Sequence, residues 1–119
     1  MPTKDEQLVS IISETARICQ MFSFKIESGD LSGAEQFFES VQGSLAMLTK
    51  SEFIDRASTN QKLMLTSTLF QAFKRFKDAN LFRSAGSLKE IVRTYSANIL
   101  NDELHAEEAQ FIERLNEQL

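Results

Sequence analysis

The residues with the clearest chemical potential are six basic side chains in the second half of the chain: Lys74, Arg75, Lys77, Arg83, Lys89 and Arg93. Lysine and arginine bind phosphate oxygens, and such contacts give salt-dependent affinity that is blind to base sequence. The first three lie near the end of a predicted helix, where cations also complement the negative helix terminus. A DNA or phosphate contact and a purely structural role therefore both stay open.

Closely spaced phenylalanines form a second candidate site, in two pairs: Phe22 with Phe24, and Phe37 with Phe38. Side chains that are adjacent, or two apart, cannot both face one core on a helix. We expect one member of each pair to meet a second surface, in another protomer or a protein partner. Most of the other phenylalanines are expected in the core.

Catalysis and metal binding have little support in the sequence. The chain has one cysteine, Cys19, and one histidine, His105, too few for a structural zinc site. Cys19 falls on an apolar helix face, where cysteine behaves as a small hydrophobic residue. The adjacent acids Asp102-Glu103 and Glu107-Glu108 would point about 100° apart on a helix and form no dyad. We therefore predict no enzyme activity, no metal, no cofactor and no small-molecule substrate.

Helices must position these residues, because apolar side chains recur at three- and four-residue steps through most of the chain. The pattern predicts helices over about 8–27, from about 32 to 48, a short one near 53–57, and then over 60–77, 88–99 and 104–115. Residues 78–86 are the most loop-like stretch. A faint echo, fifty residues apart, between 29–41 and 79–91 suggests two related helical hairpins.

Several helix starts have recognisable caps. Ser32 with Glu35, and Thr49 with Glu52, fit the capping box in which side chain and backbone satisfy each other. Thr59-Asn60 is expected to cap the fourth helix, and Asn101 or Asp102 the last one.

Composition restricts the class of protein. The 119 residues include one proline and four glycines, and no strand-like alternation stands out, so we predict an all-α, compact bundle of about five to six helices. No apolar run approaches the ~18 residues of a membrane span, and Met1–Gln7 is polar, unlike a signal peptide. A cytoplasmic protein without membrane contact is expected.

Charge is distributed in three blocks. Residues 1–60 have net charge −4, residues 62–93 have seven basic against two acidic side chains, and residues 101–119 have one against six. A protein that is acidic overall can bind nucleic acid when its cations gather on one face. We divide the chain into a helical core, 1–80, and a C-terminal helical pair, 81–119.

Two separated segments contain residues in a familiar pattern. The first contains Leu45, Leu48, Ala57 and Thr59-Asn60-Gln61; the second contains Ser96, Leu100-Asn101-Asp102 and Glu107-Glu108-Ala109. Both segments resemble FlhD, the flagellar transcriptional regulator subunit. Their spacing and the chain length also resemble that family. The resemblance implies a mostly helical homodimer that acts with an FlhC-like protein partner on promoter DNA. It also implies that the helical core, 1–80, is the dimerisation region and that the C-terminal pair, 81–119, is a mobile DNA- or partner-binding element.

Two functions thus stay open. One is a non-enzymatic transcription regulator subunit of the FlhD type. The other is a small helical adaptor, chaperone or inhibitor that acts by protein–protein contact alone.

Overall fold

A computed structural model describes residues 3–119, apart from the side chain of Lys4. Met1 and Pro2, which open the polar N-terminal segment, lie outside the described residues. The helices are α1 (Lys4–Glu27), α2 (Leu31–Met47), α3 (Ser51–Ile54), α4 (Thr59–Asp78), α5 (Phe82–Ile99) and α6 (Ala106–Glu117). Residues 3–119 contain no strand, so the predicted all-α fold of five to six helices is confirmed.

The turns that follow α1 and α4 have the same geometry. Each contains one residue with positive φ: Gly29 at 83°, and Asn80, 51 residues later, at 63°. In both turns the next amide donates to the carbonyl oxygen five residues earlier, at 2.8 Å. This is the hydrogen bonding of a Schellman cap, which ends a helix in a left-handed residue. The pairs α1–α2 and α4–α5 are therefore two helical hairpins. Within each hairpin, the two helices are connected by the same type of turn.

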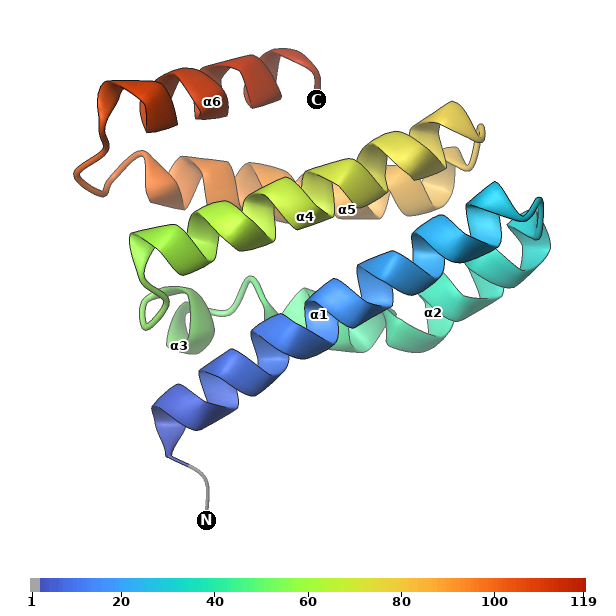
Figure 1. Ribbon diagram of the computed structural model, residues 1–119, viewed down its shortest axis with the longest axis horizontal. Coiled ribbons are helices and arrows are strands. Elements are labelled where there is room, and N and C mark those ends of the chain that lie inside the picture. The colour runs from blue at the N-terminus through green and yellow to red at the C-terminus, as the bar shows by residue number, and fades with distance from the viewer. Residues whose placement is uncertain (1–2) are drawn as a thin grey trace.

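The two hairpins lie side by side in two layers (Figure 1). α1 and α4 run in the same direction in the front layer, and α2 and α5 run the opposite way behind them. The shortest dimension of the molecule, 19 Å, matches two helix diameters. α6 packs on α5 and covers one end of this stack, whereas no described helix covers the outer side of the α1–α2 hairpin.

Aromatic rings fill the space where the hairpins meet. Phe22 of α1 is fully buried, and its ring centroid lies 5.4 Å from that of Phe37, 5.8 Å from that of Phe38 and 5.0 Å from that of Phe76. On the α5 side, the buried hydroxyl of Tyr95 donates to the carbonyl oxygen of Leu48 at 2.7 Å. These contacts join both hairpins into one core.

Helix bodies fall close to the predicted ranges, but the predicted caps of α2 and α4 are wrong. α2 begins at Leu31, because the Asp30 carboxylate accepts from the Gly33 amide at 3.0 Å and caps the helix before Ser32. α4 is capped by Ser58, which forms a capping box with Gln61, and not by Thr59-Asn60. In both cases a neighbouring polar side chain of at least equal capping ability accepts the hydrogen bond from the third amide of the helix.

Two further caps and one loop also differ from the prediction. The Thr49 hydroxyl donates to the carbonyl of Ala46 at 2.8 Å and leaves α3 without a side-chain cap. α6 is preceded by His105, whose amide donates to Glu108 at 2.9 Å, and not by Asn101 or Asp102. The stretch 78–86 is mostly helical, because the Schellman cap reverses the chain within residues 79–81.

The predicted boundary at residues 80–81 falls in the turn of the α4–α5 hairpin, and these two helices form the most extensive helix pair. Whether residues 81–119 act as a mobile element stays a prediction. Among residues 3–119, no helix is both long and apolar enough to cross a membrane.

Candidate nucleic-acid interface

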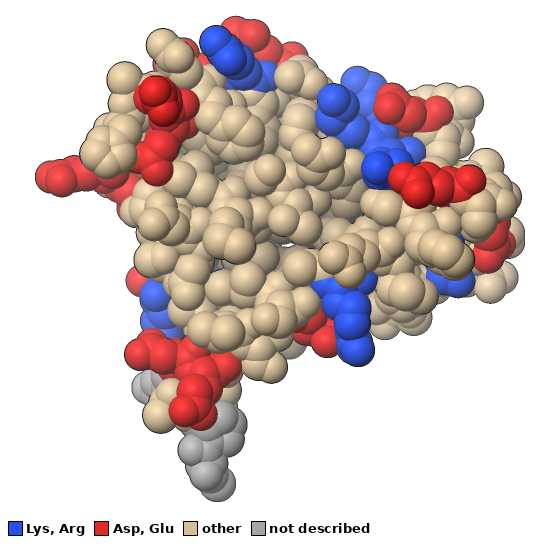
Figure 2. Space-filling view, in the orientation of Figure 1, with Lys and Arg blue, Asp and Glu red and all other residues tan. Residues whose placement is uncertain are grey.

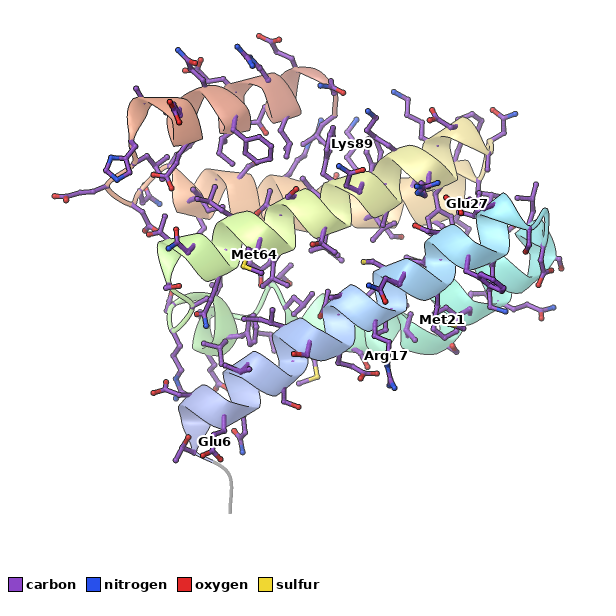
Figure 3. All side chains as sticks on the ribbon, in the orientation of Figure 1. Glu6, Arg17, Met21, Glu27, Met64 and Lys89 are labelled. Carbon is purple, nitrogen blue, oxygen red and sulfur yellow. The ribbon has the colours of Figure 1, made fainter. Side chains whose placement is uncertain are left out.

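Three of the predicted phosphate contacts form a surface that we name the cationic surface: Lys74, Lys77 and Lys89. Lys74 and Lys77 share one face of α4 because they are three residues apart. Lys89 projects from α5 on the side of the hairpin where α6 lies (Figure 3). Figure 2 shows basic side chains gathered over the C-terminal half of α4, with carboxylates at their edge.

The two α4 lysines rest on aromatic rings. The ammonium group of Lys74 lies 5.7 Å from the ring centroid of Phe70, and that of Lys77 lies 5.8 Å from the ring centroid of Phe73. Both rings are buried, so each lysine stem covers apolar surface while its charge stays in solvent. No carboxylate among the described residues lies within 4.0 Å of Lys74, Lys77 or Lys89. Their charges remain available to an anionic ligand.

The three arginines of the predicted site differ from these lysines. Arg75 points toward α1, where its guanidinium lies 2.6 Å from Glu27, and this pair joins the two hairpins. Arg93 lies 3.4 Å from Glu90 on its own helix. Arg83 is exposed in the first turn of α5, about 120° around the helix from Lys89. Arg75 therefore has mainly a structural contact. Arg93 lies one turn after Lys89 on α5, and Arg83 lies on another face of that helix.

The four phenylalanines of the predicted interface separate into core and surface. Phe22 and Phe38 are buried in the shared core, so neither is accessible to a partner in this fold. Phe37 is half-buried against Phe22. Phe24 is 69% exposed and is the one member of the set that presents most of its ring to solvent. Only Phe24 retains the geometry of an interface anchor.

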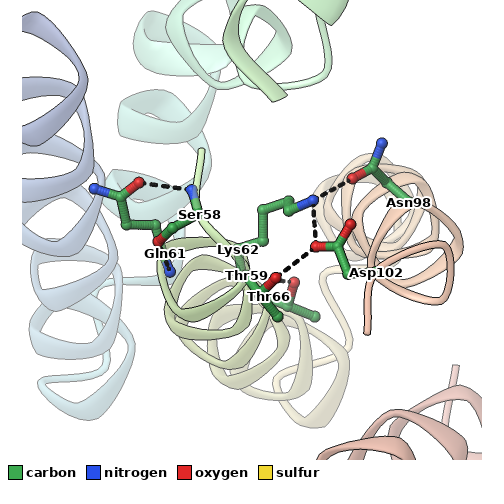
Figure 4. Close-up of polar contacts among 7 residues, drawn as sticks. All are labelled: Ser58, Thr59, Gln61, Lys62, Thr66, Asn98 and Asp102. Atoms are coloured by element: carbon green, nitrogen blue, oxygen red, sulfur yellow. Dashed lines mark hydrogen bonds and ion pairs between the residues drawn. The ribbon is translucent and has the colours of Figure 1, made fainter. Parts of the chain in front are cut away.

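A part-buried polar cluster around the buried Lys62 links α4 to the segment before α6 (Figure 4). The ammonium of Lys62 lies 2.6 Å from the carboxylate of Asp102 and donates to Asn98 Oδ1 at 2.9 Å. The Thr59 hydroxyl donates to the same Asp102 oxygen at 2.8 Å. Hydrogen bonds from Lys62 and from Thr59 hold the pKa of Asp102 below its ordinary value. The sequence alone gives no signal for this cluster, because its members lie up to 43 positions apart and meet only where α5 packs on α4.

An open groove runs along the outer side of the α1–α2 hairpin, and we name it the outer groove. Its apolar lining comes from both helices: Leu8, Ile11, Ile18, Met21, Phe37, Val41, Met47 and Leu48. Three adjoining hollows of about 220, 180 and 300 Å³ make it up, and neighbouring hollows share lining residues such as Ile11 and Ile18. Met21 and Arg17 point to this side of α1, away from α4 (Figure 3).

The candidate catalytic groups lie in separate places with different properties. Cys19 is buried in the core, and burial raises the pKa of its thiol to about 12, so the reactive thiolate is absent near neutral pH. His105 is exposed at the start of α6. Among the described residues, no three or more His, Cys, Asp or Glu side chains group in a way that could hold a metal ion.

Comparisons with models of known protein families, with curated proteins and with solved structures found no match to this chain.

Proposed function

We propose that this chain is a non-enzymatic, cytoplasmic transcription regulator subunit of the FlhD type. It acts as a homodimer with a protein partner on promoter DNA, and the cationic surface contacts the phosphate backbone. Lysines that contact phosphates supply affinity and position the protein, while base-edge contacts supply sequence specificity.

The observation that carries this proposal is the cationic surface itself. Lys74 and Lys77 share one face of α4, and Lys89 projects from α5 on the side where α6 lies. No carboxylate among the described residues lies within 4.0 Å of any of the three. These three positive charges therefore form a basic site on a chain whose net charge is −4. Such a cluster attracts a polyanion even when the rest of the protein is acidic.

The arrangement of the two FlhD-like segments also supports the proposal. Thr59 belongs to the first segment and Asp102 to the second, and they are joined by a 2.8 Å hydrogen bond within the Lys62 cluster. Residues 43 positions apart thus share one structural role. This hydrogen bond forms only when both segments are present in the same chain. It therefore gives a physical reason why the two segments occur together.

The test compares two double variants that change charge by the same amount. Lys74→Glu/Lys77→Glu reverses two lysines of the cationic surface, whereas Lys50→Glu/Arg56→Glu reverses two exposed cations near α3. Affinity for a labelled DNA duplex, measured by fluorescence anisotropy, should fall by at least about tenfold in the first variant and little in the second. Equal losses in both variants, or no loss in the first, would contradict the proposal.

A second candidate is an adaptor, chaperone or inhibitor that acts by protein contact alone. The observation that favours it is the exposure of Phe24 and of the outer groove, since large exposed apolar groups often mark interfaces. This candidate predicts that the wild-type chain shows no more DNA affinity than its Lys74→Glu/Lys77→Glu variant. Alanine at Phe24 should then weaken partner binding without loss of helicity.

A further inference from the structure

The outer groove is the side of the hairpin stack on which no other helix of residues 3–119 packs. Met21 and Val41 line it, and Met21 is 40% exposed. The equivalent turns place Ala72 and Val92, 51 residues later, at the corresponding positions of the second hairpin, and both are buried. A stacked helical hairpin buries its apolar face against the next unit, so an uncovered face is incomplete.

The opposite end of the stack shows which kind of element completes a hairpin in this fold. There a single amphipathic helix, α6, lies on α5 and buries Ile112 and Leu115. Its carboxylates Glu107, Glu113 and Glu117 remain exposed. One amphipathic helix therefore suffices to cover a hairpin side, and the same kind of element fits the outer groove.

The charges that line the outer groove indicate which charge a helix bound there should have. Glu14 is already neutralised by Arg17, with 2.7 Å between the guanidinium and the carboxylate. At the α3 end, Lys50 and Arg56 line the groove, and neither lies within 4.0 Å of a carboxylate among the described residues. They outnumber Glu52, the remaining carboxylate of the lining. The unpaired charge is thus net positive and complements an acidic ligand.

We propose that the outer groove docks an acidic amphipathic helix of a protein partner. Apolar side chains at three- and four-residue spacing would pack between Met21, Val41 and Met47, as in other helix-in-groove complexes. Carboxylates near one end of that helix would pair with Lys50 and Arg56. The inference rests on the proposed function in one respect: it gives the required protein partner a surface, separate from the cationic surface.

The test uses the full chain and two synthetic peptides in the absence of DNA. One labelled helical peptide carries leucine at heptad positions a and d and glutamate at most others; the second carries lysine in place of glutamate. Binding is followed by fluorescence anisotropy. The wild-type chain should bind the acidic peptide at least about tenfold more tightly than the basic one. Lys50→Glu/Arg56→Glu should reverse this preference.

A matched pair of methionine variants locates the site. Met47→Glu places a charge in the groove at a residue 55% exposed, whereas Met64→Glu places one on α4, outside the groove, at a residue 61% exposed. Both should fold, because both side chains are mostly in solvent. Met47→Glu should weaken binding of the acidic peptide by at least about tenfold, and Met64→Glu should leave it unchanged.

Three results would overturn the inference: no binding of either peptide, equal effects of the two methionine variants, or a wild-type dimer that Met47→Glu alone dissociates in sedimentation experiments. The last result would assign the groove to a second copy of the chain. Because no DNA is present, failure of the DNA-binding proposal would leave peptide binding intact, and the two failures can be told apart.

Discussion

Replacing Asp102 with alanine should destabilise the protein, because it leaves Lys62 charged and buried without a carboxylate. The Lys62 side chain is 6% exposed, and its ammonium lies 2.6 Å from Asp102. Removing one partner of a buried ion pair costs about 3–5 kcal/mol. Here Asn98 still accepts a hydrogen bond from Lys62, and the Asp102 side chain is 24% exposed, so water reaches the site. We expect a loss of about 2–3 kcal/mol.

Urea unfolding followed by far-UV circular dichroism measures this loss, and the melting temperature should fall by about 10 °C. The double variant Lys62→Met/Asp102→Ala removes the orphan charge as well, so it should recover at least half of the lost free energy of unfolding. If Asp102→Ala alone left the free energy of unfolding unchanged, Lys62 would be solvated in the folded protein and the reasoning would be refuted.

The same cluster predicts a dependence on pH. The hydrogen bonds from Lys62 and Thr59 lower the pKa of Asp102 from its ordinary value of 3.8. A carboxyl group whose pKa is lower in the folded state stabilises the fold above the unfolded-state pKa, and this contribution is lost as the pH falls through the folded-state pKa. Below about pH 4, the free energy of unfolding should therefore fall more steeply for the wild type than for Asp102→Asn.

Other predictions concern the core and the turns. Phe22→Ala should lower the free energy of unfolding by about 3–5 kcal/mol, because the ring is fully buried among three others; Phe24→Ala should change it by less than about 0.5 kcal/mol in the same denaturation assay. Cys19 should react with a thiol reagent near neutral pH only as the protein unfolds, since burial raises its pKa to about 12; rapid labelling of the folded chain would contradict its burial. Asn80→Gly should stabilise the fold by about 0.5–1 kcal/mol, because φ is positive there; a lowered melting temperature would count against that account of the turn.

The helices were predictable because their cause is local. Apolar side chains at three- and four-residue steps and the scarcity of proline and glycine predict α2 and α4 within a residue or two of their observed bounds. They also predict the ends of α1 and α5, but not their starts, which lie four and six residues earlier than expected. The caps were less predictable, because adjacent polar residues compete for the same amides. Asp30 competes with Ser32, and Ser58 competes with Thr59, and the sequence does not show which of them adopts the cap conformation.

The candidate site depended on contacts that lie far apart in sequence. Arg75, a predicted phosphate contact, is paired with Glu27, and only the packing of α4 against α1 reveals this pairing. The Lys62–Asp102 pair likewise joins the start of α4 to the segment that follows α5, 40 residues later in the sequence. The burial of Phe22 and Phe38 follows from the way the two hairpins meet, a property that helix periodicity alone does not determine.

The salt dependence of DNA affinity tests the proposed function most directly. Three lysines that each neutralise one phosphate should give a slope of about −3 per chain for log affinity against log salt concentration. Lys89→Ala should reduce the size of that slope by about one, and Lys74→Glu/Lys77→Glu should reduce it by at least about two. A slope near zero for the wild type, or the same slope in all three proteins, would contradict a role of the cationic surface in DNA binding.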